Sequence, residues 1–296
     1  MKELDLTQGR LPKVLVHFAV PFLLANVLQA LYGGADLFVV GQYDDAASVA
    51  AVAIGSQVMQ TVTGVILGLT TGITVLIGIA TGAKDDRKTA SIVGTGIWLI
   101  AVVAAVLTAL MVALHGQIAV WMHTPVEAMR DTEAYLWICS MGIPFIIGYN
   151  VVCGILRGLG DSRTPLYFVA LACVLNIVLD FILVGACGMR AAGAAAATVT
   201  AQGVSFATAF GFLYRKGFHF EFTRRDIRPV RALCRQMTLL GAPIALQDLL
   251  VNLSFLLITV IVNGMGVVAS AALGVVEKLI VFAMLPPMAI ASAVAA

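Results

Sequence analysis

Apolar runs of about 20 residues recur along the whole chain, and this feature limits the possible folds more than any other. A run of that length, wound as a helix, crosses the hydrocarbon core of a bilayer. The composition agrees, because 60% of the 296 residues are hydrophobic, only 11% are charged and the mean hydropathy is +1.00. Sheets with open edges cannot satisfy their backbone groups in lipid. The chain is therefore predicted to be an all-α polytopic membrane protein.

Eight membrane-spanning helices are predicted. Several of them contain the glycines and prolines that are common in membrane helices. Their approximate limits are His17–Val40, Val49–Thr81, Thr89–Leu114, Tyr135–Leu156, Pro165–Cys187, Ala192–Tyr214, Thr238–Asn263 and Val267–Ala291.

The loops between these spans differ in charge, and the difference predicts the orientation. Lysines and arginines concentrate in cytoplasmic loops, so we expect a cytoplasmic N-terminus and a location in the plasma (inner) membrane. Trp121 and Trp137 then fall at the outer interface, where aromatic side chains are expected. The outer side carries only Arg130 and Arg190, and Lys278 lies inside the eighth span. The basic residues of the inner side are Lys2, Arg10, Lys13, Lys84, Arg87, Lys88, Arg157, Arg163, Arg215, Lys216, Arg224, Arg225, Arg228, Arg231 and Arg235.

The part of the chain after the sixth span resembles its beginning. Phe18-Ala-Val-Pro21 has an echo in Leu240-Gly-Ala-Pro243, and both segments enter the membrane from the same predicted side. Such a pair predicts a parallel repeat of two lobes. We expect an N-lobe of spans 1–6 (residues 1–216), a cytoplasmic basic linker (217–236) and a partial C-lobe of spans 7 and 8 (237–296). A basic linker beside a membrane helix indicates contact with anionic lipid and not with nucleic acid.

Polar side chains within the apolar runs mark the candidate site. Asn176 and Asp180 are four residues apart and share one helix face, while Asp36 lies near the end of the first run. A charged side chain at such a position costs roughly 2.5–3.5 kcal/mol even on the mildest scale. Asp36, Asp180 and Thr198 lie about 6–11 Å below the predicted outer boundary at 1.5 Å per residue. These oxygens predict a site for Na⁺ or a proton; the alternative is a polar network that only packs helices together.

Other polar groups in the spans carry weaker predictions. Gln57, Thr61 and Gln202 are expected to line a cavity. Glu277 and Lys278 are adjacent, so they point about 100° apart on a helix and are not expected to pair with each other. Each is expected to face the cavity or a helix outside this chain.

Two features of the sequence, a GxGD motif and five cysteines, are also found in enzymes or metal sites. Gly158-Leu-Gly-Asp161 spells the GxGD of intramembrane aspartyl proteases, but Asp161 falls in a basic loop, where we expect it to form a turn before Pro165. The five cysteines show neither metal-ligand spacing nor a disulfide framework. We predict no enzyme activity, no cofactor and no metal beyond Na⁺ at the polar residues of the spans.

An ordered set of motifs resembles one transporter family. The first span reads Pro21-x14-Asp36-x4-Gly41, and the fourth connection reads Arg157-Gly-Leu-Gly-Asp-Ser-Arg-Thr-Pro165. Asn176-x3-Asp180 and Gly193-Ala-Ala-Ala-Ala-Thr198 follow in the fifth and sixth spans. Together they resemble the MATE (multidrug and toxic compound extrusion) family of cation-coupled antiporters, with Gly274-Val-Val-Glu277-Lys278-Leu279 nearer its DinF-like branch.

The resemblance implies a function. A MATE-like protein uses H⁺ or Na⁺ to export organic cations or drugs across the plasma membrane, and it is monomeric when full length. The coupling ion would bind at Asp36, Asn176, Asp180 and Thr198, and Pro21 would act as a hinge. Cavity residues would include Tyr135, Gln57, Gln202 and Glu277, although the place of Tyr135 at the outer end of its span favours an aromatic at the membrane interface.

The sequence also departs from the resembled pattern. Members of that family normally have twelve spans, so about four are expected to be missing after the eighth. Val251 and Asn252 stand where some members carry a glutamate, which argues against a sodium site of that kind in the C-lobe. Two further interpretations stay open, namely a flippase for lipid-linked precursors and a non-transporting fragment of such a transporter.

Overall fold

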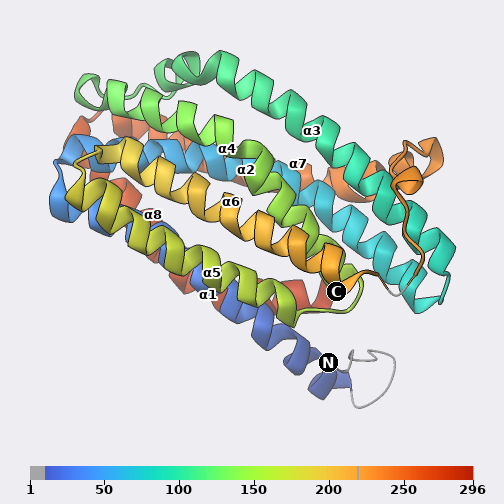
Figure 1. Ribbon diagram of the computed structural model, residues 1–296. Helices are drawn as coiled ribbons and strands as arrows, with labels where there is room; N and C mark the ends of the chain where they lie inside the picture. The colour runs from blue at the N-terminus through green and yellow to red at the C-terminus, as the bar shows by residue number, and fades with distance from the viewer. Residues whose placement is uncertain (1–10, 219, 296) are drawn as a thin grey trace.

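The protein is a bundle of long helices (Figure 1). A computed structural model describes residues 11–218 and 220–295, apart from the side chains of 11–19, 21, 22, 216, 224, 282 and 285–295. No strand occurs within those ranges. The α-helices are α1 (Leu11–Tyr43), α2 (Ala46–Gly82), α3 (Asp86–Trp121), α4 (Val126–Gly158), α5 (Arg163–Asp180), α6 (Arg190–Lys216), α7 (Arg231–Asn263) and α8 (Val267–Ala295).

Each predicted span corresponds to one of these helices, so the all-α polytopic fold is confirmed. In the part of the chain that is described, seven helices are long and apolar enough to cross a membrane. Helices α2 and α3 begin earlier than the predicted apolar runs because aspartates cap them. Asp45 accepts a hydrogen bond from the backbone N–H of Ser48 at 3.0 Å, and Asp85 does the same for Lys88 at 3.0 Å.

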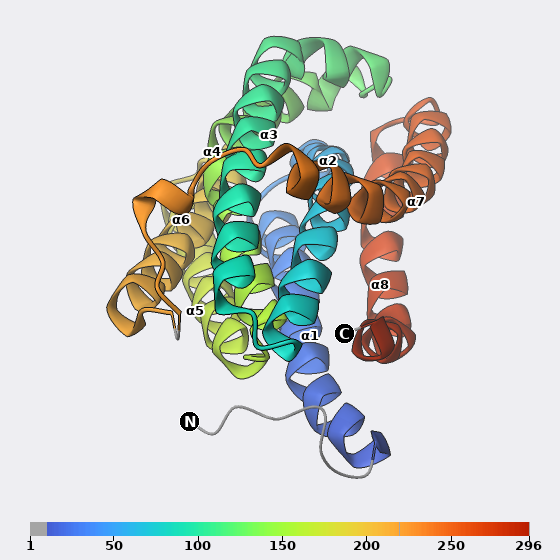
Figure 2. The same ribbon diagram turned by 90° about the vertical axis from the view of Figure 1, so that its right-hand side faces the viewer.

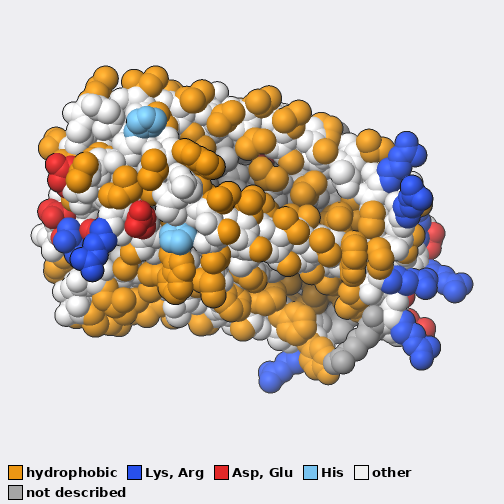
Figure 3. Space-filling model, turned by 90° about the horizontal axis from the view of Figure 1, so that it is seen from above, with side chains coloured by type: hydrophobic (Ala, Val, Ile, Leu, Met, Phe, Trp, Pro, Cys, Tyr) orange, Lys and Arg blue, Asp and Glu red, His pale blue; other side chains and the backbone are white. Residues whose placement is uncertain are grey.

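The helices run roughly side by side, with their connections at two ends. Figure 2 shows α7 and α8 on one flank of the bundle, where α8 lies against α1 and α7 against α2. Figure 3 shows apolar side chains over most of one face and a group of Lys and Arg side chains at one end. This separation is the one expected of a helical protein whose middle lies in lipid.

Small residues bring α2 and α7 into backbone contact. A Cβ at Gly72 would lie 2.6 Å from the Met237 carbonyl oxygen and 2.8 Å from the Gly241 nitrogen. A Cβ at Gly68 would collide with the backbone of Ala245. Close approach of this kind stabilises helix pairs in lipid, where no hydrophobic force drives them together.

The connection between α6 and α7 is shorter than predicted. α7 begins at Arg231, so residues 231–236 are helical and not part of a linker. The rest of the connection packs on α3, where the Thr95 hydroxyl donates to the Arg228 carbonyl at 3.2 Å. Gly94 leaves no room for a Cβ beside the Asp226 carbonyl. The backbone of this segment is therefore held by protein, while Arg225 and Arg228 are exposed.

An ion-pair network closes the opposite end of the bundle. Arg190, at the start of α6, lies 3.2 Å from Asp44, 3.0 Å from Asp45 and 3.2 Å from Asp131. Ser48 joins the network, because its hydroxyl donates to Asp44 at 2.9 Å and to Asp131 at 3.2 Å. The Ser48 backbone N–H and then Arg190 hold the pKa of the Asp45 carboxyl below its usual value. The Arg190 network thus ties α1, α2, α4 and α6 together.

We expect Gly72→Val to destabilise the protein by about 1–3 kcal/mol, because the new side chain would force α2 and α7 apart. The measurement is the free energy or midpoint of unfolding in detergent or bicelles. Gly82→Val is the matched control, since a Cβ at Gly82 meets nothing within 4 Å. Equal effects of the two substitutions would contradict the close α2–α7 contact.

We expect Arg190→Gln to lower the stability at neutral pH by about 1 kcal/mol, since the network is partly exposed. A carboxyl whose folded pKa is depressed stabilises the protein above its unfolded pKa and loses this effect as pH falls through the folded value. The difference from wild type should therefore shrink below about pH 4. Thermal unfolding at several pH values measures it, with the exposed Arg130→Gln as control. A difference that persists in acid would show that the ion pairs are not its source.

Candidate functional site

Three helices bring four of the predicted site residues together. Asp36 comes from α1, Asn176 and Asp180 from α5, and Thr198 from α6. The Asn176 amide donates to the Thr198 hydroxyl at 3.3 Å, and that hydroxyl donates to Asp36 Oδ2 at 3.3 Å. The Asp180 carboxyl lies beside that of Asp36, near enough for the two to share a proton. We call these four residues the polar cluster.

Local structure explains how the polar cluster forms. Asp180 is the last residue of α5, and the chain continues as a π-helix over Phe181–Ala186, a form that often occurs at functional sites. A Cβ at Gly193 would lie 3.1 Å from the Leu183 carbonyl carbon, so α6 passes close to this π-helix. Ala194, Ala195 and Ala197, which follow Gly193, are buried, and these small side chains let Thr198 reach between α1 and α5.

The polar cluster is buried and under-bonded. Asp36, Asn176 and Asp180 are 4%, 1% and 0% exposed. Among the described residues, no amide, hydroxyl or basic group donates a hydrogen bond to one Asp36 oxygen, the Asn176 carbonyl oxygen or either Asp180 oxygen. A buried polar atom without a partner costs about 1–3 kcal/mol, and more when it is charged. A network that served packing alone would satisfy these atoms, so the oxygens are suited to hold a cation or a shared proton.

The donor set fits a hard cation or a proton. Carboxylate, amide and hydroxyl oxygens are the ligands that small hard cations prefer. Among the described residues no three His, Cys, Asp or Glu side chains gather, so a transition-metal site of that kind is not seen there. Two neighbouring carboxyls can also hold one proton between them.

A second layer of side chains surrounds Asp36. Tyr32 lies one helical turn before it on α1, and the Gln202 side chain from α6 lies at the Tyr32 hydroxyl. Tyr135 is only 3% exposed and packs on Gly55, where a Cβ would collide with its ring. The interface interpretation of Tyr135 is therefore wrong, because a ring at the lipid surface would be exposed. Tyr32 was not predicted, although its spacing of four from Asp36 was available in the sequence.

The other predicted positions lie on α1, α2 and α8. Gln57 and Thr61 are buried on α2, and the Thr61 hydroxyl donates to the Gln57 carbonyl at 3.0 Å, within its own helix. Glu277, on α8, has a buried carboxyl oxygen without a partner. Pro21 lies within the continuous helix α1, and its side chain is outside the described residues, so its role as a hinge stays a prediction.

Lys278 is placed differently from the prediction. It was expected to face a cavity or a helix outside this chain. Its ammonium group instead lies beside α1, 3.6 Å from where a Cβ of Gly33 would be. A Cβ at position 33 would be in ordinary van der Waals contact with this ammonium group.

Asp161 takes the role that the sequence predicted for it. The Thr164 backbone N–H and hydroxyl donate to its carboxylate at 3.0 and 2.6 Å, which fixes the turn before α5. At about 1.5 Å per residue, the helix separates Asp161 from Asp180 by roughly 28 Å. The two aspartates cannot act on one bond, so the protease interpretation is excluded.

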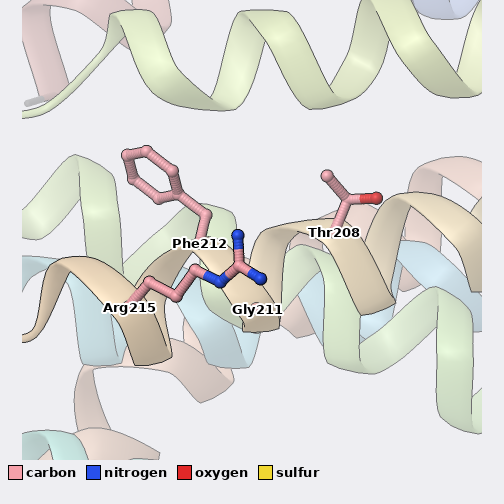
Figure 4. A pocket seen from close by; sticks show the side chains of 4 residues that line it. All are labelled: Thr208, Gly211, Phe212 and Arg215. Atoms are coloured by element: carbon pink, nitrogen blue, oxygen red, sulfur yellow. The ribbon is translucent and has the colours of Figure 1, made fainter.

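A hollow of about 610 Å³ lies near the last turns of α6 (Figure 4). Thr208, Gly211, Phe212 and Arg215 line it from one face of the helix. Arg215 is separated from Thr198 by roughly 26 Å of helix. The hollow is therefore distinct from the polar cluster.

Known proteins resemble this chain over nearly all of it. The MatE family model matches residues 21–182. A probable multidrug resistance protein of Bacillus subtilis, YpnP, is 33% identical over 99% of this chain and 66% of its own length. The multidrug export protein MepA of Staphylococcus saprophyticus is 24% identical over 91% of this chain and 60% of its own length. This chain thus spans between 60% and 66% of the length of these two relatives.

Solved structures also resemble this chain over nearly all of it. The inward-facing conformation of a multidrug resistance MATE family transporter matches with a TM-score of 0.83 and 25% identity, over 90% of this chain and 60% of that one. A MOP superfamily transporter from Pyrococcus furiosus matches with a TM-score of 0.87 and 25% identity, over 99% of this chain and 65% of that one.

Removal of the Thr198 hydroxyl should weaken the polar cluster. We expect Thr198→Val to cost about 0.6 kcal/mol of stability and at most about 1.7, the range of hydrogen bonds between membrane helices. Thr198→Ser keeps the hydroxyl and should stay near wild type. Thr208→Val is the control, because its exposed hydroxyl bonds only to the Val204 carbonyl of its own helix. The measurement is the free energy of unfolding, with and without sodium chloride. Equal losses of stability in the two valine variants would contradict a role of the Thr198 hydroxyl between Asn176 and Asp36.

Proposed function

Because this chain belongs to the MATE family, a family of transporters and not of enzymes, we propose that it acts in the cation-coupled export of small organic molecules. The observation that carries the proposal is the set of unpartnered oxygens at Asp36, Asn176 and Asp180. In this proposal the polar cluster binds the coupling ion, H⁺ or Na⁺. Organic cations or drugs are the exported substrates, as the names of the multidrug relatives suggest.

The chemistry of the polar cluster supports ion coupling. An uncompensated carboxylate is costly within a membrane-spanning segment, so ion binding at Asp36 and Asp180 has a large energetic effect. An antiporter needs an ion whose binding changes the relative stability of two orientations. Asp36, Asp180 and Thr198 lie on α1, α5 and α6, so one ion would act on the relative positions of three helices.

The same proposal assigns roles to the rest of the chain. Helices α1–α6 form an N-lobe, and α7 and α8 belong to a second lobe that faces it. Tyr135, Gln202, Gln57 and Glu277 contribute to a cavity between the lobes, and Pro21 allows α1 to bend. The charge distribution favours a cytoplasmic N-terminus in the plasma membrane, with Arg225 and Arg228 near anionic lipid. The working unit in this proposal is a monomer.

We expect Asp180→Asn to reduce ion-driven efflux by about tenfold or more, because loss of a charged ligand costs about 1.5–3 kcal/mol. The measurement is efflux of ethidium from membrane vesicles under an imposed proton or sodium gradient. Glu221→Gln is the matched control, since Glu221 is exposed in the connection before α7.

Each variant must reach the membrane at the level of wild type before rates are compared. Wild-type efflux by an Asp180→Asn protein at that level would refute the role of the polar cluster. Separate sodium and proton gradients, applied to the wild type, identify the coupling ion.

A further inference from the structure

Helices α1 and α8 pack antiparallel, with glycines at their contact. A Cβ at Gly274 of α8 would collide with Ala53 of α2 and would lie 4.0 Å from the Leu37 side chain of α1. Lys278 follows Gly274 by one turn of α8, and Gly33 precedes Leu37 by one turn of α1. The Lys278 ammonium lies beside Gly33. The antiparallel contact between α1 and α8 therefore continues over two helical turns. Lys278 is held against α1 by the packing of its own helix.

This register places the ammonium near the polar cluster. Asp36 follows Gly33 by three residues, so both lie on adjacent turns of one face of α1. Asp36 and Lys278 attract each other electrostatically in this arrangement. The other ionisable groups around the pair are Tyr32 on α1, Asp180 on α5 and Glu277 on α8. Lys278 is the cation with a resolved electrostatic effect on Asp36.

A lysine within a membrane span needs a reason, because its charge costs roughly 2.5–3.5 kcal/mol there. Asp36 offers a compensating charge, and one of its oxygens has no hydrogen-bond partner. The coupling ion would bind the same carboxylate. The Lys278 ammonium and a coupling ion would both be attracted to the single negative charge of Asp36. Each therefore weakens the binding of the other to this carboxylate.

We propose that Lys278 is a tethered cation that competes with the coupling ion for Asp36, so that ion binding at the polar cluster loosens α8 from α1. The inference rests on the proposed function and assigns Lys278 as a positioning residue within it. The lysine attracts α8 to α1 when the cluster holds no ion. Neutralisation of Asp36 by H⁺ or Na⁺ removes that attraction and frees the α1–α8 contact to change. The lysine thus sets the ion affinity.

Removal of the competing charge should tighten ion binding. We expect Lys278→Met to lower the sodium or proton concentration that gives half-maximal ethidium efflux by about fivefold or more, the lower end of typical coupling between sites. Lys278→Arg keeps the charge and should stay within about twofold of wild type, well below that coupling. Lys88→Met is the matched control, because Lys88 is exposed at the start of α3. A lysine with a purely structural role would change the amount of folded protein and not the half-maximal concentration.

A binding measurement separates this inference from the transport proposal. The thermal unfolding midpoint of the purified protein is followed against sodium chloride, and against pH in its absence, for the same variants. Lys278→Met should respond at lower ion concentration than wild type even if no efflux is observed. Lys278→Gln replaces the methionine variant if that protein does not accumulate. Unchanged half-maximal concentrations in both measurements would overturn the competition, whereas absent efflux with shifted ion binding would refute only the transport proposal.

Discussion

The burial of two carboxyl groups side by side, Asp36 on α1 and Asp180 on α5, is the constraint on which the rest of the structure depends. Charged groups are unfavourable in an apolar interior, and two of the same sign are more so. The hydrogen bonds that the surrounding helices supply come from the Thr198 hydroxyl and the Asn176 amide, and neither group carries a charge. The arrangement is therefore stable only with a compensating cation or proton, and this need is the physical basis of the proposed coupling.

Close helix packing is what makes this arrangement possible. Hydrophobic association is weak between helices in lipid, so small residues and shape decide which helices touch. Gly193 allows α6 to approach the π-helix after Asp180, and Gly72 allows α7 to rest on α2. At one end of the bundle, Arg190 joins four helices through acidic residues and Ser48. These contacts hold three different helices in register at the polar cluster.

Much of this could be predicted from the sequence, and the limits have physical causes. The spans follow from apolar runs, and the common depth of Asp36, Asp180 and Thr198 follows from counting residues along helices. The π-helix at Phe181–Ala186 could not be predicted, because one extra residue per turn leaves no mark on hydropathy. The burial of Tyr135 and the position of Lys278 depend on which helices are neighbours. Helix adjacency is set by contacts such as Gly55 with Tyr135, which no periodicity in a single helix reveals.

Helix α1 packs against α5 and α6 and also against α8. Its Asp36 contacts α5 and α6, while Gly33, on the adjacent turn of the same face, and Leu37 contact α8. A change of charge at Asp36 therefore acts on both contacts at once, without any signal that must travel through the bundle. In the proposed mechanism, attraction to Lys278 favours the α1–α8 contact, and ion binding favours the contact with α5 and α6. Two contacts of one helix would then respond in opposite directions to the charge of one carboxylate. Such a difference between two states is what an ion needs in order to shift the equilibrium between them.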